Sequence, residues 1–486
     1  MRSTLALTAT LLLTAPGMAE AQKAPGESRP ASQGVQPAAD EAVRLHAEGI
    51  AHHAAGRFAD ALAPLERSSQ LIAETLGQGH PATLRVQLDY ALSLEGGHRY
   101  ADASAITDRI VRQARDPQLL PLFIEAAEIE ARLKARLGDY ANALELYELL
   151  YEYARQRFGA RSREALDYRL ETAMILSRQA RVEEAETLAR SLVHDASALQ
   201  PPDFNRTYRA RWVLADVLRE TRRHDDMIEL YLRNLEESAL QAGPDSAVAL
   251  ASLLDLAMGR VHQGEFDQAR MLAGRAWTIY ERRGQADLQA ARALNIMAIA
   301  EAELGPNGLA RAEALTRQAL TILSRTSGAG SHDALQVRFN LASYVADQGR
   351  MSEAQTLHRE NYRLFEDLLG AAHPQTALSL EGAAIASITL GADNAVQRDL
   401  ETAITAYDAA LSPEHAHAVR ARTRLARFLL QGETAPARAL AVTRTAAAPI
   451  FSRISDGQND LSDELTLNAL TTHVDALWAA ARDAEG

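Results

Sequence analysis

Small and apolar residues recur at a nearly constant interval along most of the 486-residue chain. Ten positions form the series, and neighbouring members lie 40 to 43 residues apart. Five positions before most of them stands a residue suited to a tight turn, usually glycine. The ten marker residues are Ala61, Ala103, Ala143, Ala185, Met227, Ala269, Ala312, Ala354, Val396 and Ala437.

A second series supports the first. Twelve positions before each marker, nine of the ten residues are Gly or Ala, from Gly49 to Ala384, and Leu425 is the exception. Small residues suit the crossing point of two antiparallel helices, because a larger side chain would force the backbones apart. The pattern therefore predicts a helix, a turn and a second helix in every unit. It is weakest at residues 219–232, where no Gly or Ala occupies the turn, and in the ninth and tenth units.

One sequence motif, called the repeated phrase below, occurs twice at the same position within the repeat. LGQGHPATL at 76–84 returns as LGAAHPQTAL at 369–378. Gly77 can end a helix in the left-handed conformation, and Pro81 can open the next helix, where a missing N–H has no cost. We interpret the phrase as the connector between successive units rather than as a catalytic loop.

These features resemble the tetratricopeptide repeat (TPR) superfamily. The resemblance rests on the small residue of the first helix, the turn residue, the Ala marker five positions later, and an aromatic residue two positions after the turn. That aromatic residue is Phe58, Tyr100, Tyr140 or Phe266. The period of about 42, rather than the usual 34, is similar to the longer variant of kinesin light chains and many bacterial proteins. The resemblance implies an all-α, right-handed α-solenoid of about ten TPR-like repeats over residues 40–450, with peptides docking on its inner surface.

Four positions of each first helix are predicted to line that surface: three and six residues before the small residue, and one and four after it. The middle of the array gives a charged set with one tryptophan: Glu125, Glu128, Arg132, Asp167, Arg209, Trp212, Asp216 and Arg219. The later units give an apolar set: Leu254, Met258, Val261, Leu294, Met297, Leu304 and Phe339. We hypothesise that Trp212 and the arginines anchor a partner peptide, because Trp and Arg dominate binding hot spots. The alternative is a merely solvated charged face and a Leu/Met stripe that belongs to the core.

The two ends of the chain differ from the repeats. Residues 1–21 have one basic residue, an apolar run and an A-x-A site, which predicts a signal peptide. Residues 22–39 are rich in Pro, Gly, Ser and Gln and predict a flexible leader, with Asp40 as the first helix cap. No later stretch is long and apolar enough to span a bilayer. We therefore expect a periplasmic or secreted protein.

Residues 451–486 predict a polar break followed by a C-terminal capping helix. Its large apolar residues stand at helical spacing and are expected to cover the open end of the stack. They are Leu467, Leu470, Val474, Leu477 and Trp478.

Composition and motifs narrow the chemistry. Aromatic residues make up only 5%, which suits close helix packing, and the net charge of −13 argues against nucleic acid or an anionic membrane as the main partner. With no cysteine there is no disulfide and no thiolate metal ligand. The sequence lacks the phosphate-loop, dinucleotide, zinc-hydrolase and nucleophile-elbow motifs. Its close histidine groupings, His52 with His53 and His415 with His417, have no third ligand at fixed spacing.

The predicted function is therefore a scaffold in the cell envelope that binds a protein or peptide, with no catalysis, cofactor or metal. Two alternatives remain. Bacterial arrays of this type are often followed by a caspase-like hydrolase module called CHAT, so the chain could be the regulatory half of such a system. It could also be a purely structural spacer that associates through its ends.

Overall fold

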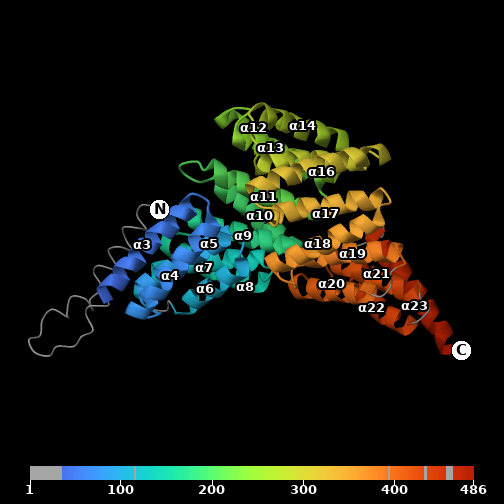
Figure 1. Ribbon diagram of the computed structural model, residues 1–486. Coiled ribbons are helices and arrows are strands. Elements are labelled where there is room, and N and C mark those ends of the chain that lie inside the picture. Colours follow the sequence, from blue (N-terminus) through green and yellow to red (C-terminus); the bar gives the residue numbers. More distant parts are fainter. Residues whose placement is uncertain (1–34, 114–116, 392–394, 432–434, 456–463, 486) are drawn as a thin grey trace, which may run out of the picture. The chain divides into compact units, whose positions relative to one another are not determined.

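The computed structural model describes residues 35–113, 117–391, 395–431, 435–455 and 464–485, and within these ranges it contains helices and no strands. Helices follow one another as first helix, turn and second helix (Figure 1). They make ten pairs and one final helix, which confirms the predicted all-α solenoid of about ten helix-turn-helix repeats. The chain forms two compact units, residues 1–156 and residues 157–486.

The first unit contains three helix pairs, with the short 3₁₀ helix η2 (Pro117–Leu119) before the third. The helices are α3 (Val35–Ala54), α4 (Phe58–Leu76), α5 (Pro81–Gly96), α6 (Tyr100–Gln113), α7 (Leu120–Arg136) and α8 (Tyr140–Phe158).

The second unit contains seven pairs and the last helix. The pairs are α9 (Arg163–Arg178) with α10 (Val182–Ser197), α11 (Phe204–Glu220) with α12 (His224–Ala242), α13 (Ala247–Gln263) with α14 (Phe266–Arg282), α15 (Leu288–Glu303) with α16 (Pro306–Thr326), α17 (His332–Asp347) with α18 (Met351–Leu369), α19 (Pro374–Thr389) with α20 (Val396–Ala410), and α21 (Ala416–Gln431) with α22 (Pro436–Ser455). The last helix is α23 (Glu464–Glu485).

The marker residues lie where the helices of a pair press together. The first nine, from Ala61 to Val396, have no exposed surface at all. The tenth marker is wrong, because Ala437 is exposed while Ala439 is completely buried. The last repeat is therefore displaced by two residues from the predicted phase.

The turns keep their geometry even where glycine is absent. Eight of the ten residues that stand five positions before a marker have positive φ, including His98, Ala180 and Arg222, with φ of 63°, 57° and 56°. At Arg222 the chain bends within RETRRH and keeps its phase, so the repeat continues through residues 219–232. The prediction is wrong at Asn307, which lies inside α16, because Gly305 makes that turn with φ of 114°. The tenth turn residue, Gly432, lies outside the described residues.

Each residue of the repeated phrase has a structural role. Gly77 has a φ of 92° at the end of α4, and Pro81 is the first residue of α5. Between them, His80 is extended and its ring nitrogen accepts a hydrogen bond from the Ala82 N–H at 3.2 Å. The Thr83 hydroxyl donates to the Gly77 carbonyl at 2.8 Å. The second copy makes the same bonds, so the phrase is a helix stop and helix start in one.

Other connectors use serine at the histidine position. Ser162, Ser246 and Ser331 each accept a bond from the backbone N–H three residues later. His415 repeats the histidine version, because its ring nitrogen accepts a bond from the His417 N–H at 3.2 Å. The second histidine grouping is thus explained by capping.

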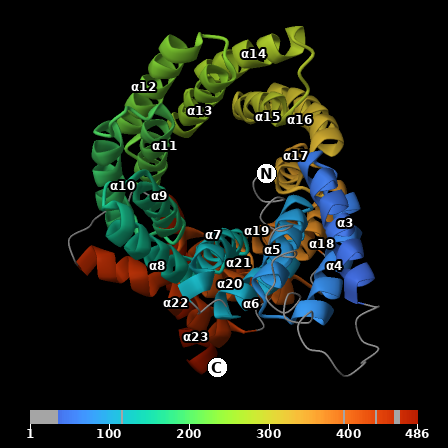
Figure 2. The same ribbon diagram turned by 90° about the vertical axis from the view of Figure 1, so that its left-hand side faces the viewer.

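The first helices of neighbouring pairs in the second unit contact one another, for example α9 with α11 and α13 with α15. In Figure 2 these four helices lie on the inner side of a curve, and α10, α12, α14 and α16 lie on its outer side. This arrangement agrees with the predicted placement of first helices on the inner surface.

The N-terminal boundary differs from the prediction. The signal peptide and most of the leader lie outside the described residues, but α3 already begins at Val35, so Asp40 lies inside this helix and is not its cap. Proline is accepted in the first turn of a helix and alanine is the strongest helix former, which explains why the segment from Pro37 to Asp40 is helical.

The last helix covers the stack with the opposite face from the one predicted. Ala469, Thr472 and Ala476 are almost completely buried. The predicted covering residues face away from the stack: Leu467, Val474, Leu477 and Trp478 are 43 to 68% exposed, and only Leu470 packs on the core. Small residues let α23 approach α21 and α22 closely. The residues from Phe451 to Ser455, predicted as the start of a polar break, belong to α22.

Candidate functional site

The charged residues predicted for the middle of the groove form ion pairs between neighbouring first helices. In α9, Asp167 and Glu171 face two arginines of α11. The Arg206 guanidinium lies 2.6 Å from the Asp167 carboxylate, and Arg209 lies 3.3 Å from Asp167 and 2.7 Å from Glu171. Two cations and two anions thus meet across the boundary between two repeats. The Arg209 side chain is engaged before any partner arrives.

A second polar group surrounds Arg219. Its guanidinium lies 2.9 Å from the Asp216 carboxylate and 2.5 Å from that of Glu220, and Asp216 also accepts a bond from the Ser177 hydroxyl of α9 at 3.1 Å. Desolvation and the positive charge of Arg219 lower the pKa of the nearby His262.

Three predicted groove residues belong to the first unit. Glu125 of α7 accepts a bond from Arg85 of α5 at 2.9 Å, and Arg132 of α7 donates two bonds to Glu95 of α5 at 2.8 and 2.7 Å. Glu128 is half-buried on the same helix. These residues join the first helices of the second and third pairs, as Asp167 and its partners do further along the chain.

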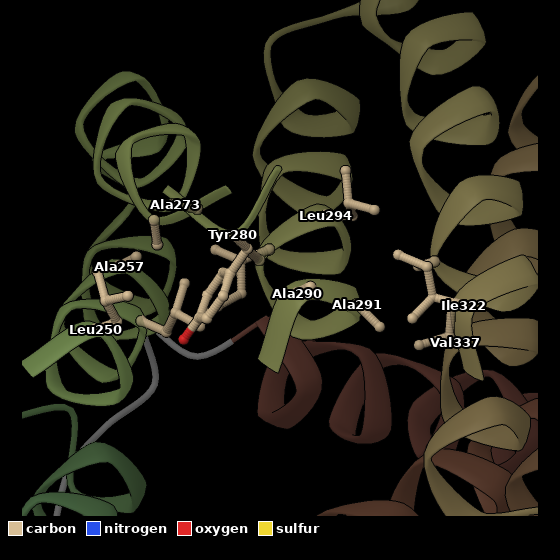
Figure 3. Close-up of a cluster of buried hydrophobic side chains, with 14 of the residues drawn as sticks. Leu250, Ala257, Ala273, Tyr280, Ala290, Ala291, Leu294, Ile322 and Val337 are labelled. Carbon is tan, nitrogen blue, oxygen red and sulfur yellow. The ribbon is translucent and has the colours of Figure 1, made fainter. Parts of the chain in front are cut away.

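The apolar set divides into core and surface. Leu254 and Leu294 have no exposed surface, so their prediction as groove residues is wrong. Figure 3 shows Leu294 within the cluster that also contains Leu250, Ala257 and Tyr280. They fill the space between neighbouring helix pairs, where a side chain of that size is enclosed on every side. Leu304 is exposed but stands at the end of α15, where it is the C-terminal cap residue.

Four large side chains keep part of their surface exposed, one on each first helix from α11 to α17. Trp212, Met258 and Met297 are half-buried and pack against the core clusters. Phe339 is also half-buried, and its ring meets the edge of the His358 ring with centroids 5.0 Å apart. Val261 is half-buried beside them on α13. We call Trp212, Met258, Met297 and Phe339 the apolar stripe.

The repeat architecture is also visible in family comparisons. Residues 40–82 and residues 339–375 match the tetratricopeptide repeat family model. These two stretches are thus similar to tetratricopeptide repeats. No curated protein matches its sequence.

Solved structures that resemble this TPR array are distant in sequence. TPR-like repeats assigned to a kinesin light chain of Podosopora anserina are 19% identical, cover 41% of this chain and 94% of their own, and give a TM-score of 0.35. A Rap protein complexed with Competence and Sporulation Factor is 13% identical over 83% of this chain and 99% of its own, with a TM-score of 0.42. The apo form of the quorum sensor NprR from B. thuringiensis is 12% identical over 72% of this chain and 96% of its own, with a TM-score of 0.45. At these identities the likeness concerns the fold alone.

The residues that join the TPR first helices were partly missed by the sequence analysis. Asp255 of α13 is nearly buried, accepts a bond from the Tyr208 hydroxyl of α11, and lies 2.5 Å from the Arg292 guanidinium of α15. It therefore links three successive repeats. Opposite charges about one repeat apart, such as Asp255 and Arg292 at a separation of 37, are the sequence signal that could have found such pairs.

Within the described residues, no group of three or more His, Cys, Asp or Glu side chains is placed to hold a metal ion. No described helix is both long enough and apolar enough to cross a membrane.

Proposed function

We propose that this TPR-like array is an exported scaffold that binds a segment of a protein partner along the first helices of its second unit. The observation that carries the proposal is the apolar stripe, in which each first helix from α11 to α17 offers one large, partly exposed apolar side chain. Tryptophan is a frequent binding hot spot, and methionine adapts its shape to different partners.

The ion pairs favour one kind of partner. An acidic peptide would have to take Arg209 or Arg219 from the carboxylates that already hold them, at 2.7 and 2.9 Å. Separating half-buried pairs costs free energy, because the abandoned carboxylate is left without its cation. An amphipathic helix or an extended segment with apolar anchors meets no such cost, so we expect the partner to bind through apolar side chains.

Photo-crosslinking in cells tests the binding face. A photoreactive amino acid would replace Met258 of α13 in one variant and Met271 of α14 in a matched control, since Met271 is 67% exposed on a second helix. We expect the first variant, and not the second, to capture a defined partner. Equal capture from both positions would contradict a binding site on the first helices, and capture from neither would favour the structural spacer.

Alanine at position 212 gives the energetic test. Trp212→Ala is expected to weaken binding of the captured partner by about 2 kcal/mol, roughly thirtyfold, as hot-spot tryptophans do. Arg219→Gln should have a much smaller effect, because Arg219 is engaged by Asp216 and Glu220. Affinities of the purified chains are measured by calorimetry, with circular dichroism as the folding control. The reverse order of effects would mean that charge, not the apolar stripe, anchors the partner.

Export is tested independently of binding. Residues 1–21 motivate the proposal, and a cleavage after Ala21 would leave a mature chain that begins at Gln22. Terminal sequencing of the protein from fractionated cells measures both the cleavage site and the compartment. A chain that keeps Met1 and stays with the cytoplasmic markers would refute export while leaving the binding proposal intact.

A further inference from the structure

A cavity of about 250 Å³ lies in the first unit between the second helices α4 and α6, with α5 beneath it. Its walls carry Glu66 and Gln70 on one side and Arg109 on the other, and Gln87 and Tyr90 of α5 line it from below. It is formed by the second-helix side of the array and contains none of the predicted groove residues. Ligand pockets usually range from about 300 to 1,000 Å³, so this cavity suits a very small ligand.

The cavity contains a buried acceptor that nothing in the protein satisfies. Gln87 is only 4% exposed, and its amide nitrogen donates to the Gln78 side-chain oxygen at 3.1 Å. Its own oxygen, Oε1, is buried and has no hydrogen-bond partner among the described residues. Because an unsatisfied buried acceptor is unfavourable, a ligand that brings an N–H or O–H donor to this atom gains a bond without displacing one.

The walls offer opposite charges. Neither Glu66 nor Arg109 forms an ion pair with any residue in the described part of the chain. Tyr90 stands half-buried beside them, and burial, followed by the negative charge of Glu66, raises the pKa of its phenol. Its hydroxyl therefore stays protonated and can donate a hydrogen bond.

Two other repeats bridge the equivalent space with an ion pair. The position of Gln87, four residues before the small residue of the first helix, is arginine in three repeats and Leu, Ile or Ala in the remaining six. Arg211 reaches Glu237 on the second helix of its own pair at 2.8 Å, and Arg338 reaches Glu360 at 3.5 Å. The second repeat has a shorter, uncharged glutamine at this position and lacks this ion pair.

The residue opposite Gln87 has changed as well. Arg109 stands 22 residues after Gln87, which is the same separation as that of Glu360 from Arg338. The second helix thus carries a cation where the eighth repeat carries a carboxylate. Both changes together leave an open space with an unpaired cation on one wall and an unpaired anion, Glu66, on the other.

We propose that this cavity binds a dipeptide as a zwitterion. The ligand carboxylate pairs with Arg109 and its ammonium group with Glu66, the peptide N–H donates to Gln87 Oε1, and the Tyr90 hydroxyl donates to the peptide carbonyl. A charged wall on each side selects a molecule with both free termini. Because Glu66 and Arg109 are exposed to water, each contact is weak, and we expect dissociation constants of roughly 0.1 to 1 mM.

The test uses the purified full chain and three probes: dialanine, N-acetyl-dialanine and dialanine amide. Binding is followed by ligand-observed NMR up to about 10 mM. We expect dialanine to bind and each blocked form, which lacks one charged terminus, to bind about tenfold more weakly or not at all. A chain that does not bind dialanine, or that binds all three probes equally, would overturn the proposal.

Three variants localise the site. Gln87→Met keeps the length of the side chain but removes the acceptor, and Arg109→Gln removes the cation; both are expected to weaken dialanine binding about tenfold. The matched control is Arg67→Gln, which removes an exposed cation of α4 that does not line the cavity, and it should bind as the unaltered chain does. Glu66→Gln alters an exposed residue and cannot unfold the core, so it keeps the test decisive if Gln87→Met folds poorly. Unchanged affinity in Arg109→Gln and Glu66→Gln would place dialanine elsewhere and refute the site.

Discussion

Gly49 tests the close-packing rule on which the whole repeat is built. It lies inside α3, twelve residues before Ala61, where most other repeats have alanine. A Cβ atom added to Gly49 would lie 2.4 Å from Leu65 Cγ, 2.8 Å from Leu65 Cδ2 and 3.3 Å from the Ala61 carbonyl oxygen. Leu65 is completely buried in α4.

The sign of Gly49→Ala depends on two opposing effects. Alanine is favoured over glycine inside a helix by about 0.5 to 1 kcal/mol. Forcing an extra methyl group into a packed core costs about 1 to 3 kcal/mol. We therefore expect Gly49→Ala to destabilise the first helix pair by about 1 kcal/mol. In a Leu65→Ala background the overlap with Leu65 is removed and only the 3.3 Å approach to the Ala61 carbonyl oxygen remains, so there Gly49→Ala should be neutral or should stabilise by up to about 1 kcal/mol.

The assay is amide hydrogen exchange of α3 and α4 followed by mass spectrometry, because it reports the local opening of one helix pair in a long array. A change of 1.4 kcal/mol corresponds to a tenfold change in exchange rate. Gly274→Ala in α14 is the control, since its nearest neighbour outside the helix would be Met297 Cε at 3.9 Å, and it should stabilise. If Gly49→Ala has the same effect with Leu65 and with Ala at position 65, close approach is not the reason for the small residue.

Further predictions address the last repeats and the pH dependence. In urea unfolding, Ala439→Leu should lower the free energy of unfolding by about 1 to 3 kcal/mol and Ala437→Leu by less than about 0.5 kcal/mol. Equal effects would contradict the assignment of Ala439, rather than Ala437, to the buried crossing point. Ala476→Glu should detach α23 and expose it to proteolysis, whereas Trp478→Glu should not; the opposite result would mean that α23 packs through its large residues. Burial lowers the pKa of His358 to about 4, below its value of 6.5 in the unfolded chain, so the unfolded state binds the proton first and stability is lost as pH falls from about 6.5 to 4. The free energy of unfolding, measured at about pH 7 and pH 4, should differ by about 3 kcal/mol less in His358→Gln than in the unaltered chain. The same difference in both chains would show that this histidine is protonated in the folded state.

The fold was predictable because it repeats one steric demand. Where two helices pack closely, a residue such as Ala143 must be small. Most repeats therefore have a small residue at this position, and the regular spacing of these residues is visible in the sequence. The demand on the turn is conformational, and Arg222 meets it with a left-handed backbone that no composition rule indicates. The last repeat was misplaced because Ala437 and Ala439 are the same residue type, and a pattern of residue types cannot choose between them.

The candidate site was less predictable, because a helical position does not determine exposure. Trp212 and Leu254 both stand three residues before the small residue of their helix, yet Trp212 is half-buried and Leu254 has no exposed surface. The sizes of the neighbouring side chains, which differ between repeats, decide the outcome. Likewise, the sequence placed the charged residues on the correct first helices but missed some of their ion-pair partners. Arg206, for example, does not fall at any of the four chosen positions.

The C-terminal helix shows how the close-packing rule could have been applied further. Helical spacing alone identifies two faces of α23, one with Ala469 and Ala476 and one with Val474 and Trp478, and hydrophobicity favours the second. The repeats themselves give the opposite answer, since in them the small residue marks the buried crossing point and the large residues lie beside it. Applied to α23, that rule selects the alanine face, which is the face that packs on α21 and α22. In an array built by close approach, small residues are thus better indicators of a buried helix face than large apolar ones.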